Sequence, residues 1–336
     1  LPNVIFGPPI AVFVVLCHNP HMEFRHLGSS GLKISEISLG NWLTHGGQIA
    51  EDTAHACVRT ALDGGITTFD TADVYAGTVA EEVLGRALAG QRRESLEIFT
   101  KVYFPTGSGV NDRGLSRKHI MESCNASLRR LQTDYVDIWQ IHSWDPHNPL
   151  EDTLSALDYA YSSGKARYVG ISNFSGWQSA RAITIQESNS AKAPIVTNQV
   201  EYSLLNREIE NEVLPCADET GIGILAWAPL GRGVLTGKYR KGIPSDSRAA
   251  APHFVKHVEP YLRDKPQRIV EAVAVAAEGL GFAPLEVALA WVRDTPGITS
   301  AIVGARTGAQ LRGILTSEEI TLPEIVRDAL NEISAP

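Results

Sequence analysis

The chain has 336 residues, of which 43% are hydrophobic and 20% are charged, and its formal net charge is −8. This length accommodates one large barrel or two ordinary domains. The negative charge excludes a general nucleic-acid binder, because a phosphate backbone requires a basic face. The four cysteines form no Cys-x-x-Cys pair, so we expect neither a zinc ribbon nor a dense disulfide framework. Reduced thiols in the cytoplasm are the simpler interpretation.

The first 21 residues differ from the rest of the chain. They contain the apolar run 10–17, which lacks the basic flank and the cleavage site of a signal peptide and is too short to span a bilayer. Met22 opens the segment Met22–Gly28, which reads like a natural beginning. We therefore expect residues 1–21 to be a non-native or misannotated, disordered leader. Residues 22–336 are expected to form the folded domain, with no insertion into a membrane.

From about residue 35 onward, short apolar runs alternate with segments of helical period. The runs are Ile37–Trp42, Thr67–Thr71, Leu96–Val102, Val136–His142, Arg167–Ser172, Ile195–Glu201, Ile222–Ala228 and Ser300–Gly304. Apolar residues recur every three or four positions in Thr53–Leu62, Ala80–Leu88, Arg117–Leu131, Asp152–Ser162 and Glu208–Glu219. Runs that are too apolar to leave either face in water are typical of parallel strands covered by helices. The pattern predicts a (β/α)8 TIM barrel in a single domain, ending in a C-terminal helix.

The least regular stretch of the chain is Gly231–Pro266, which follows the seventh predicted strand. It is rich in Gly, Pro, Arg and Lys, and it is too long for an ordinary barrel connection. Long loops at this end of a barrel usually serve a binding site, so we expect this one to do so. A surface insertion without a function is the alternative.

Polar residues follow the predicted strands where each strand ends. Asp70 and Tyr75 follow the second strand, and Lys101 and His142 end the third and the fourth. Because the C-terminal ends of barrel strands face one mouth, these four side chains should converge there. Each alone also fits a structural role, such as an ion pair, a packed ring or a core histidine. Four of them at one mouth favour a catalytic site.

The four side chains suit proton delivery to an oxygen that gains negative charge. A phenol has a pKa of about 10, and an adjacent ammonium group is expected to lower it toward the working range. A carboxylate beside the lysine would hold it charged and in place. The imidazole can donate a hydrogen bond to a carbonyl oxygen and orient it toward the phenol.

Two motifs resemble the signatures of the aldo-keto reductase superfamily. They are Gly65–Tyr75 and Leu131–Ile138, the second followed by Ile141 and His142. The likeness covers Phe24–Ile333. Within the superfamily, the chain resembles most the branch of voltage-gated potassium channel β-subunits and their bacterial relatives. The segments that carry this likeness are Gly46–Ile49, Arg113–Ile120 and Trp227–Leu230.

The resemblance implies a role for each candidate catalytic residue. Tyr75 would donate the proton, Lys101 would tune its pKa, Asp70 would pair with that lysine, and His142 would orient the carbonyl group. The channel subunits usually have asparagine at the position of His142, so the histidine favours a free-standing enzyme.

The resemblance also implies contacts to NADPH or NADP+. Ser172, Asn173 and Gln199 would hold the nicotinamide carboxamide, and Trp227 would stack on the nicotinamide ring. The expected cofactor-binding residues are Trp42, Gln48, Ser172, Asn173, Gln199, Trp227, Ala228, Pro229, Leu230, Gly231, Gly233, Lys238, Arg248, Gly304, Arg306 and Gln310. No Gly-x-Gly-x-x-Gly follows a predicted strand, so a Rossmann site is not indicated.

Cations in the cofactor set favour NADPH over NADH. Lys238, Arg248 and Arg306 could meet phosphates, and Arg306 is the residue we expect at the 2′-phosphate. The family often has Glu-Asn where this chain has Gly313 and Ile314, so recognition of the adenine is expected to be built differently.

The leading hypothesis is NADPH-dependent reduction of a small aldehyde or ketone, with Trp42, Tyr103, Phe104 and Trp144 as candidate walls of the substrate site. One alternative is a regulatory subunit that senses the NADPH/NADP+ ratio with little turnover. Another is a lyase that forms a Schiff base on Lys101, which a paired, protonated amine disfavours. We expect no bound metal, no nucleic-acid partner and a possible homo-oligomer. His253, His257 and Glu259 in the long loop are too few and too loosely spaced to indicate zinc.

Overall fold

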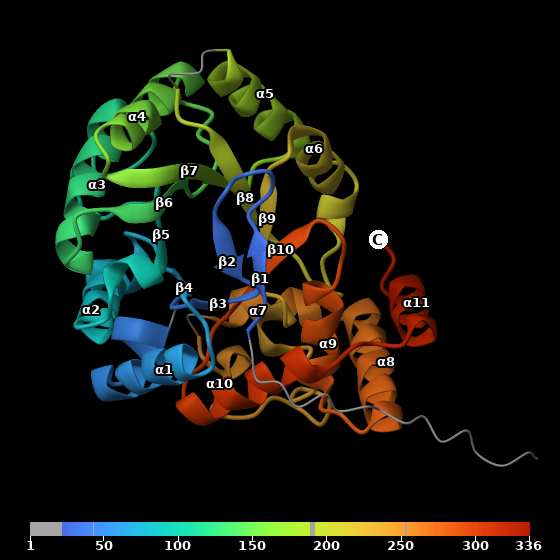
Figure 1. Cartoon of the computed structure of the whole chain (residues 1–336). Helices are drawn as coiled ribbons and strands as arrows, with labels where there is room; N and C mark the ends of the chain where they lie inside the picture. The colour runs from blue at the N-terminus through green and yellow to red at the C-terminus, as the bar shows by residue number, and fades with distance from the viewer. Residues whose placement is uncertain (1–21, 43, 189–191, 253) are drawn as a thin grey trace, which may run out of the picture.

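The centre of the structure, a computed structural model that describes residues 22–336 except 43, 189–191 and 253, is a closed barrel of parallel strands (Figure 1). The strands follow one another around the barrel in the order β10-β3-β4-β5-β6-β7-β8-β9. They are β3 Ile37–Gly40, β4 Thr68–Asp70, β5 Glu97–Val102, β6 Val136–Ile141, β7 Ala166–Ser172, β8 Ile195–Glu201, β9 Gly223–Trp227 and β10 Ile298–Val303. Each predicted run overlaps one of them, so the (β/α)8 TIM barrel is confirmed. The predicted leader, residues 1–21, lies outside the described residues.

Helices surround the barrel and cover the outer faces of the strands (Figure 1). They are α1 Glu51–Asp63, α2 Val79–Leu88, α3 Arg117–Leu131, α4 Leu150–Ser162, α5 Gly176–Glu187, α6 Val213–Thr220, α7 Val255–Val258, α8 Asp264–Leu280, α9 Pro284–Arg293, α10 Gly308–Leu315 and α11 Glu324–Ile333. All six residues of β6 and of β10 are buried, because helices cover one face and barrel side chains the other. The predicted C-terminal helix is α11.

The predicted helices in the first half of the chain agree with the structure to within two residues at either end. The prediction Glu208–Glu219 was partly wrong. A 3₁₀ turn at Glu208–Glu210 precedes α6, which begins at Val213. Pro215 has no N–H to donate, so a helix tolerates it only in its first turn, and it stands in the first turn of α6.

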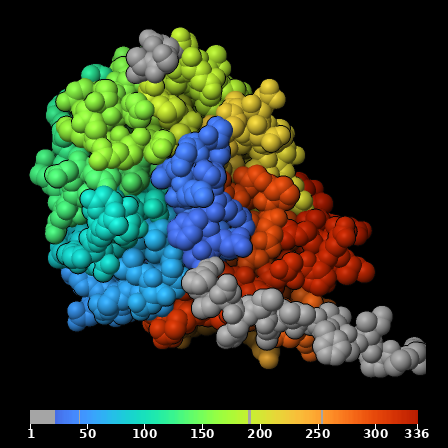
Figure 2. Space-filling model, in the orientation of Figure 1, coloured from blue at the N-terminus to red at the C-terminus, as the bar shows by residue number. Residues whose placement is uncertain are grey.

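A short N-terminal hairpin, which the sequence did not predict, closes one end of the barrel. Its strands are β1 Phe24–His26 and β2 Lys33–Ser35, paired antiparallel. Leu27 and Ile34 are fully buried, and they pack against the side chains that fill the barrel interior, among them Phe99, Ile138 and Leu225. Figure 2 shows the hairpin, in dark blue, over the middle of this face. The candidate site must therefore lie at the opposite end of the barrel.

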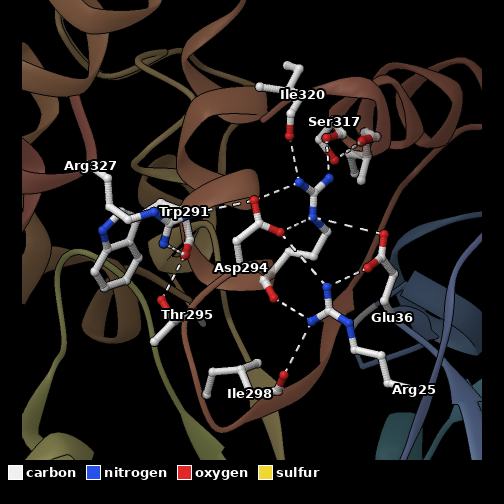
Figure 3. A network of polar contacts seen from close by, with 11 residues as sticks. Arg25, Glu36, Trp291, Asp294, Thr295, Ile298, Ser317, Ile320 and Arg327 are labelled. Atoms are coloured by element: carbon white, nitrogen blue, oxygen red, sulfur yellow. Dashed lines mark hydrogen bonds and ion pairs between the residues drawn. The ribbon is translucent and has the colours of Figure 1, made fainter. Parts of the chain in front are cut away.

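An ion-pair network anchors the hairpin to the C-terminal part of the chain (Figure 3). Arg25 of β1 donates to Glu36 at 2.6 Å and to the carbonyl oxygen of Arg293 at 2.5 Å. The guanidinium of Arg293, almost fully buried, donates to Asp294 and to the carbonyl oxygens of Ser317 and Ile320, the last two at 2.6 Å. Burial in a fully hydrogen-bonded arrangement makes this arginine a structural tie rather than a ligand group.

Helix caps fix the loops at the far end of the barrel. Ser175 caps α5 directly after β7, and its hydroxyl accepts from the N–H of Gln178, whose side chain returns a bond to the N–H of Ser175. Thr307 caps α10 after β10 in the same way, accepting from the N–H of Gln310 at 3.2 Å. The two caps hold the strand-end residues of β7 and β10 at the mouth.

The long connection after β9 is confirmed. It contains 3₁₀ turns at Gly231–Gly233 and Arg248–Ala250, the short helix α7 and a further 3₁₀ turn at Glu259–Leu262, before α8 begins at Asp264. Within the described residues, no single helix has the length and apolar character needed to cross a membrane. The bent pair α8 and α9, at 101° to each other, meets those two criteria jointly.

Candidate active site

The four predicted catalytic residues meet at the open end of the barrel. Asp70 ends β4, Lys101 lies in β5, His142 follows β6, and Tyr75 lies in the turn after β4. The Lys101 ammonium is 2.7 Å from Oδ2 of Asp70 and 3.4 Å from the Tyr75 hydroxyl. The rings of Tyr75 and His142 meet edge to face, with centroids 5.7 Å apart.

Buried partners hold Asp70 and Lys101 in one arrangement. Oδ1 of Asp70 accepts from the amide nitrogen of Gln199 at 2.8 Å, while Oδ2 accepts from Lys101. Lys101 also donates to the carbonyl oxygen of Thr71 at 2.7 Å. Burial lowers the pKa of Lys101, and the charge of Asp70 opposes that shift. The pair is therefore a preorganised ammonium group beneath the phenol.

The pKa of Tyr75 is raised well above its ordinary value, which contradicts the expected lowering. Burial is the main cause, followed by the negative charges of Asp70 and Asp73. The prediction was wrong because burial and these two negative charges outweigh the attraction of the Lys101 ammonium, which is itself paired with Asp70. The phenol consequently carries its proton at neutral pH, as a proton donor requires.

His142 is a neutral imidazole in a nearly closed setting. Burial, and after it the charge of Lys101, lowers the pKa of His142 well below its ordinary value. Its Nδ1 has no hydrogen-bond partner among the residues that the structure describes. The ring of Phe104 covers it, with centroids 4.9 Å apart. A neutral ring with a free nitrogen can exchange a hydrogen bond with a ligand's oxygen.

A cavity of about 1360 Å³ opens above these side chains. It exceeds the volumes usual for sites of drug-sized ligands. Predicted residues line most of it: Trp42, Gln48, Asp70, Tyr75, His142, Ser172, Asn173, Gln199, Trp227, Ala228, Pro229, Leu230, Gly233, Lys238, Arg248, Gly304, Arg306 and Gln310. Gly313 and Ile314 also reach it.

A hydrogen-bonded chain of strand-end residues forms one wall of the cavity. The Ser172 hydroxyl donates to the carbonyl oxygen of Gln199 at 2.7 Å, and the Asn173 amide donates to Ser172 at 3.1 Å. The Trp227 indole donates to Oδ1 of Asn173 at 3.1 Å. Asn173 and Ala228 both have positive φ, of 57° and 52°, a strained conformation that concentrates at functional sites.

The far end of the cavity is positively charged. Lys238, Arg248 and Arg306 line it together with one carboxylate, Asp246. Arg306 lies 3.6 Å from that carboxylate and donates to the Asp246 carbonyl oxygen at 2.9 Å. Burial, followed by the charges of Arg248 and Arg306, lowers the pKa of Lys238. Cations crowded in this way repel one another unless an anion joins them.

Three predicted residues do not line the cavity. Gly231 is one of them, since a Cβ at this position would lie 2.6 Å from Leu205, and its contact to the cofactor through the backbone stays a prediction. Of the four candidate substrate walls, Trp42 and Phe104 line the cavity, whereas Tyr103 and Trp144 do not. Tyr103 packs against Phe104, and Trp144 packs against Phe174 and Trp177.

Arg232 is a cavity residue that sequence reasoning missed. Its guanidinium lies over the rings of Trp42 and Trp227, 5.8 Å and 5.2 Å from their centroids, and 3.2 Å from Glu201. Its φ of 57° is positive, and both neighbouring glycines share that sign. The sequence signal that could have identified it is an arginine between two glycines in the predicted binding loop.

No metal-binding group is found among the residues that the structure describes: they contain no cluster of three potential ligands, and His253 lies outside them.

A closed (β/α)8 barrel with a buried Asp–Lys pair under a tyrosine at the C-terminal ends of its strands has the architecture of a barrel protein with its site at that mouth. The family model of the aldo/keto reductase family matches residues 36–335, and the chain belongs to that family. The chain is similar to a protein of Arabidopsis thaliana described as "Probable voltage-gated potassium channel subunit beta", with 39% identity over 318 residues, 93% of this chain and 96% of the relative. A protein of Oryza sativa subsp. japonica with the same description is 37% identical over 318 residues, 94% of this chain and 96% of that relative.

Proposed function

We propose that the protein reduces a small aldehyde or ketone to an alcohol with NADPH. The observation that carries the proposal is the contact of the Tyr75 hydroxyl with Lys101 at 3.4 Å, on the floor of a cavity of about 1360 Å³. A proton-bearing phenol beside a fixed ammonium group suits the transfer of a proton to a carbonyl oxygen.

The residues present fit a phosphorylated dinucleotide. Ser172, Asn173 and Gln199 would hold the carboxamide end beside Trp227, and the cations at the far end would meet the phosphates. Lys238, Arg248 and Arg306 face one carboxylate there, which supports NADPH over NADH. When bound, the cofactor supplies a hydride, which no side chain can supply.

Each catalytic side chain has one task in this proposal. His142, neutral and hydrogen-bonding, orients the carbonyl oxygen toward Tyr75. Tyr75 gives its proton to that oxygen and is left as a phenolate. The Lys101 ammonium stabilises this negative charge, and Asp70 holds Lys101 in place. Water from the cavity mouth returns a proton to Tyr75, so each turnover consumes one hydride and one proton.

The apolar walls near Tyr75 favour compact neutral or aromatic carbonyl substrates. Trp42, Val74, Ala76 and Phe104 line the cavity, and the ring of Phe104 lies against His142. Such walls contribute by burying apolar surface, and the indole N–H of Trp42 is the one side-chain hydrogen-bond donor among these four residues.

NADPH oxidation with a panel of aldehydes tests the proposal. We expect turnover with compact aromatic aldehydes and a loss of at least a hundredfold in Tyr75→Phe, because general acid catalysis contributes roughly 10²- to 10⁴-fold. Fluorescence quenching by NADPH and by NADH tests binding separately. Equal rates in the parent and in Tyr75→Phe would contradict the proposal.

A regulatory role is the second candidate, favoured by the similarity to two plant proteins described as probable voltage-gated potassium channel β subunits. The protein would then bind NADP(H), turn over slowly and act on another protein. Tight NADPH binding together with aldehyde reduction no faster than that of Tyr75→Phe would support this role over the enzymatic one.

We further propose a cytoplasmic protein whose partner is the small carbonyl substrate rather than nucleic acid, with self-association into a homo-oligomer. Cys57, Cys124 and Cys216 are free thiols, which suits a reducing compartment. Cell fractionation and light scattering on a size-exclusion column test the location and the oligomeric state.

A further inference from the structure

Asp73 is a buried carboxyl group for which the proposed reaction has no use. It lies in the same turn as Asp70 and Tyr75, and its backbone N–H donates to the carbonyl oxygen of Lys101 at 3.1 Å. Its side chain is fully buried. Within the described part of the chain, neither of its carboxyl oxygens has a hydrogen-bond partner. An unpartnered buried polar group of this kind requires an explanation.

The neighbours of Asp73 outside the barrel give it one counter-charge, Arg130, which is already paired with another carboxylate. Glu81 of α2, also fully buried, accepts from Nε of Arg130 of α3 at 2.7 Å and from the Thr100 hydroxyl. Two buried carboxyl groups thus share one guanidinium, which pairs with Glu81. Burial first, and then the charge of Glu81, raises the pKa of Asp73 to about 8. Asp73 is therefore neutral at neutral pH.

The catalytic groups next to Asp73 have no spare positive charge. Lys101 is paired with Asp70 at 2.7 Å and interacts with Asp73 only through its charge, without a hydrogen bond. An ionised Asp73 would add to Asp70 in raising the pKa of Tyr75. Tyr75 would then hold its proton more tightly.

We propose that Asp73 is a positioning residue that acts through Tyr75: its neutral carboxyl leaves the phenol able to give up a proton, and its ionisation stops carbonyl reduction. This inference rests on the proposed role of Tyr75. Asp73 does not line the cavity, so it would touch neither substrate nor cofactor.

The pH dependence of kcat/KM for reduction tests the inference in Asp73→Asn, which keeps the shape of the neutral acid. We expect the parent to lose activity above about pH 8 and the variant to keep it. At pH 9 the difference should be about tenfold, because one pH unit above a pKa leaves about a tenth of the acid protonated. Glu82→Gln, in the same helix as Glu81 but 46% exposed, is the matched control and should follow the parent.

Glu81→Gln gives a test in the opposite direction. It frees Arg130 to face Asp73, so the loss of activity should move to lower pH, and adding Asp73→Asn should restore the rate. An alkaline loss that persists unchanged in Asp73→Asn, or one that Glu81→Gln does not move, would overturn the inference. The Glu81→Gln arm decides the matter if Asp73→Asn does not fold.

A measurement without turnover separates this inference from the proposed function. Ultraviolet absorbance against pH, with Tyr75→Phe subtracted in each background, reports ionisation of the Tyr75 phenol. Asp73→Asn should lower the pKa of Tyr75. An unchanged pKa would refute the coupling, whereas a lowered pKa in a protein that reduces no aldehyde would refute the proposed function alone.

Discussion

Replacing Lys101 with methionine removes the ammonium that lies 3.4 Å from the Tyr75 hydroxyl. At an effective dielectric constant of about 20, two unit charges at this separation interact by about 5 kcal/mol. If about half of the phenolate charge has developed in the transition state, the loss is ~2.5 kcal/mol, or roughly a hundredfold in kcat. Lys101 does not line the cavity, so the affinity for NADPH should change little.

The same substitution destabilises the fold, because Asp70 is left as a buried, unpaired carboxylate. Breaking one side of a buried ion pair typically costs about 3–5 kcal/mol. The double variant Lys101→Met/Asp70→Asn removes the stranded charge and should recover most of that stability without recovering kcat. It is the control that separates catalysis from folding.

Steady-state NADPH oxidation and urea unfolding should be measured on the same preparations of the parent and both variants. The reasoning fails if Lys101→Met retains kcat within about fivefold of the parent, a barrier change below about 1 kcal/mol. It also fails if the double variant regains both stability and turnover.

Three further predictions concern the cofactor and the fold. Arg306→Ala should weaken NADPH binding by roughly ten- to hundredfold and leave the affinity for NADH unchanged, because a charge-assisted hydrogen bond contributes about 1.5–3 kcal/mol. Fluorescence titration measures both affinities. Equal losses for the two dinucleotides would contradict a contact between Arg306 and the 2′-phosphate. Arg293→Met should destabilise the protein by about 3–5 kcal/mol in urea unfolding, because it leaves two buried carbonyl oxygens without a donor and takes a counter-charge from the buried Glu36. A loss below about 1 kcal/mol would contradict the structural role of Arg293. Burial first, and then Glu36, raises the pKa of Glu318 from 4.5 to about 8. The folded state then binds more protons than the unfolded state, so stability falls as pH rises through this window, and Glu318→Gln should flatten the decline in Tm; a parallel decline would refute it.

Residues whose role follows from position along a strand could be predicted from the sequence. Lys101 and His142 stand at the ends of apolar runs, and a parallel barrel brings all such ends to one mouth. The strand-end residues Asn173 and Trp227 also meet at this mouth, joined by a hydrogen bond at 3.1 Å.

Features that depend on contacts between distant segments could not be predicted. The strands of the N-terminal hairpin have three residues each, too few to show a period, and they are stabilised by packing into the barrel. The raised pKa of Tyr75 depends on burial and on the pairing of Lys101 with Asp70, which spacing does not reveal. Gly231 turns toward Leu205 because of local backbone geometry, although its neighbours in the loop line the cavity.

The hairpin that closes one end of the barrel leaves the candidate active site open to solvent at the opposite end. Leu27 and Ile34 seal the hairpin end completely, so everything that reaches Lys101 and Tyr75 arrives and departs through the same mouth. Two ligands that share one opening must bind in order. The ligand that lies deeper in the cavity binds first and is released last. Binding or release of a ligand through this opening, rather than the chemical step, is then a candidate for the rate-limiting step of turnover.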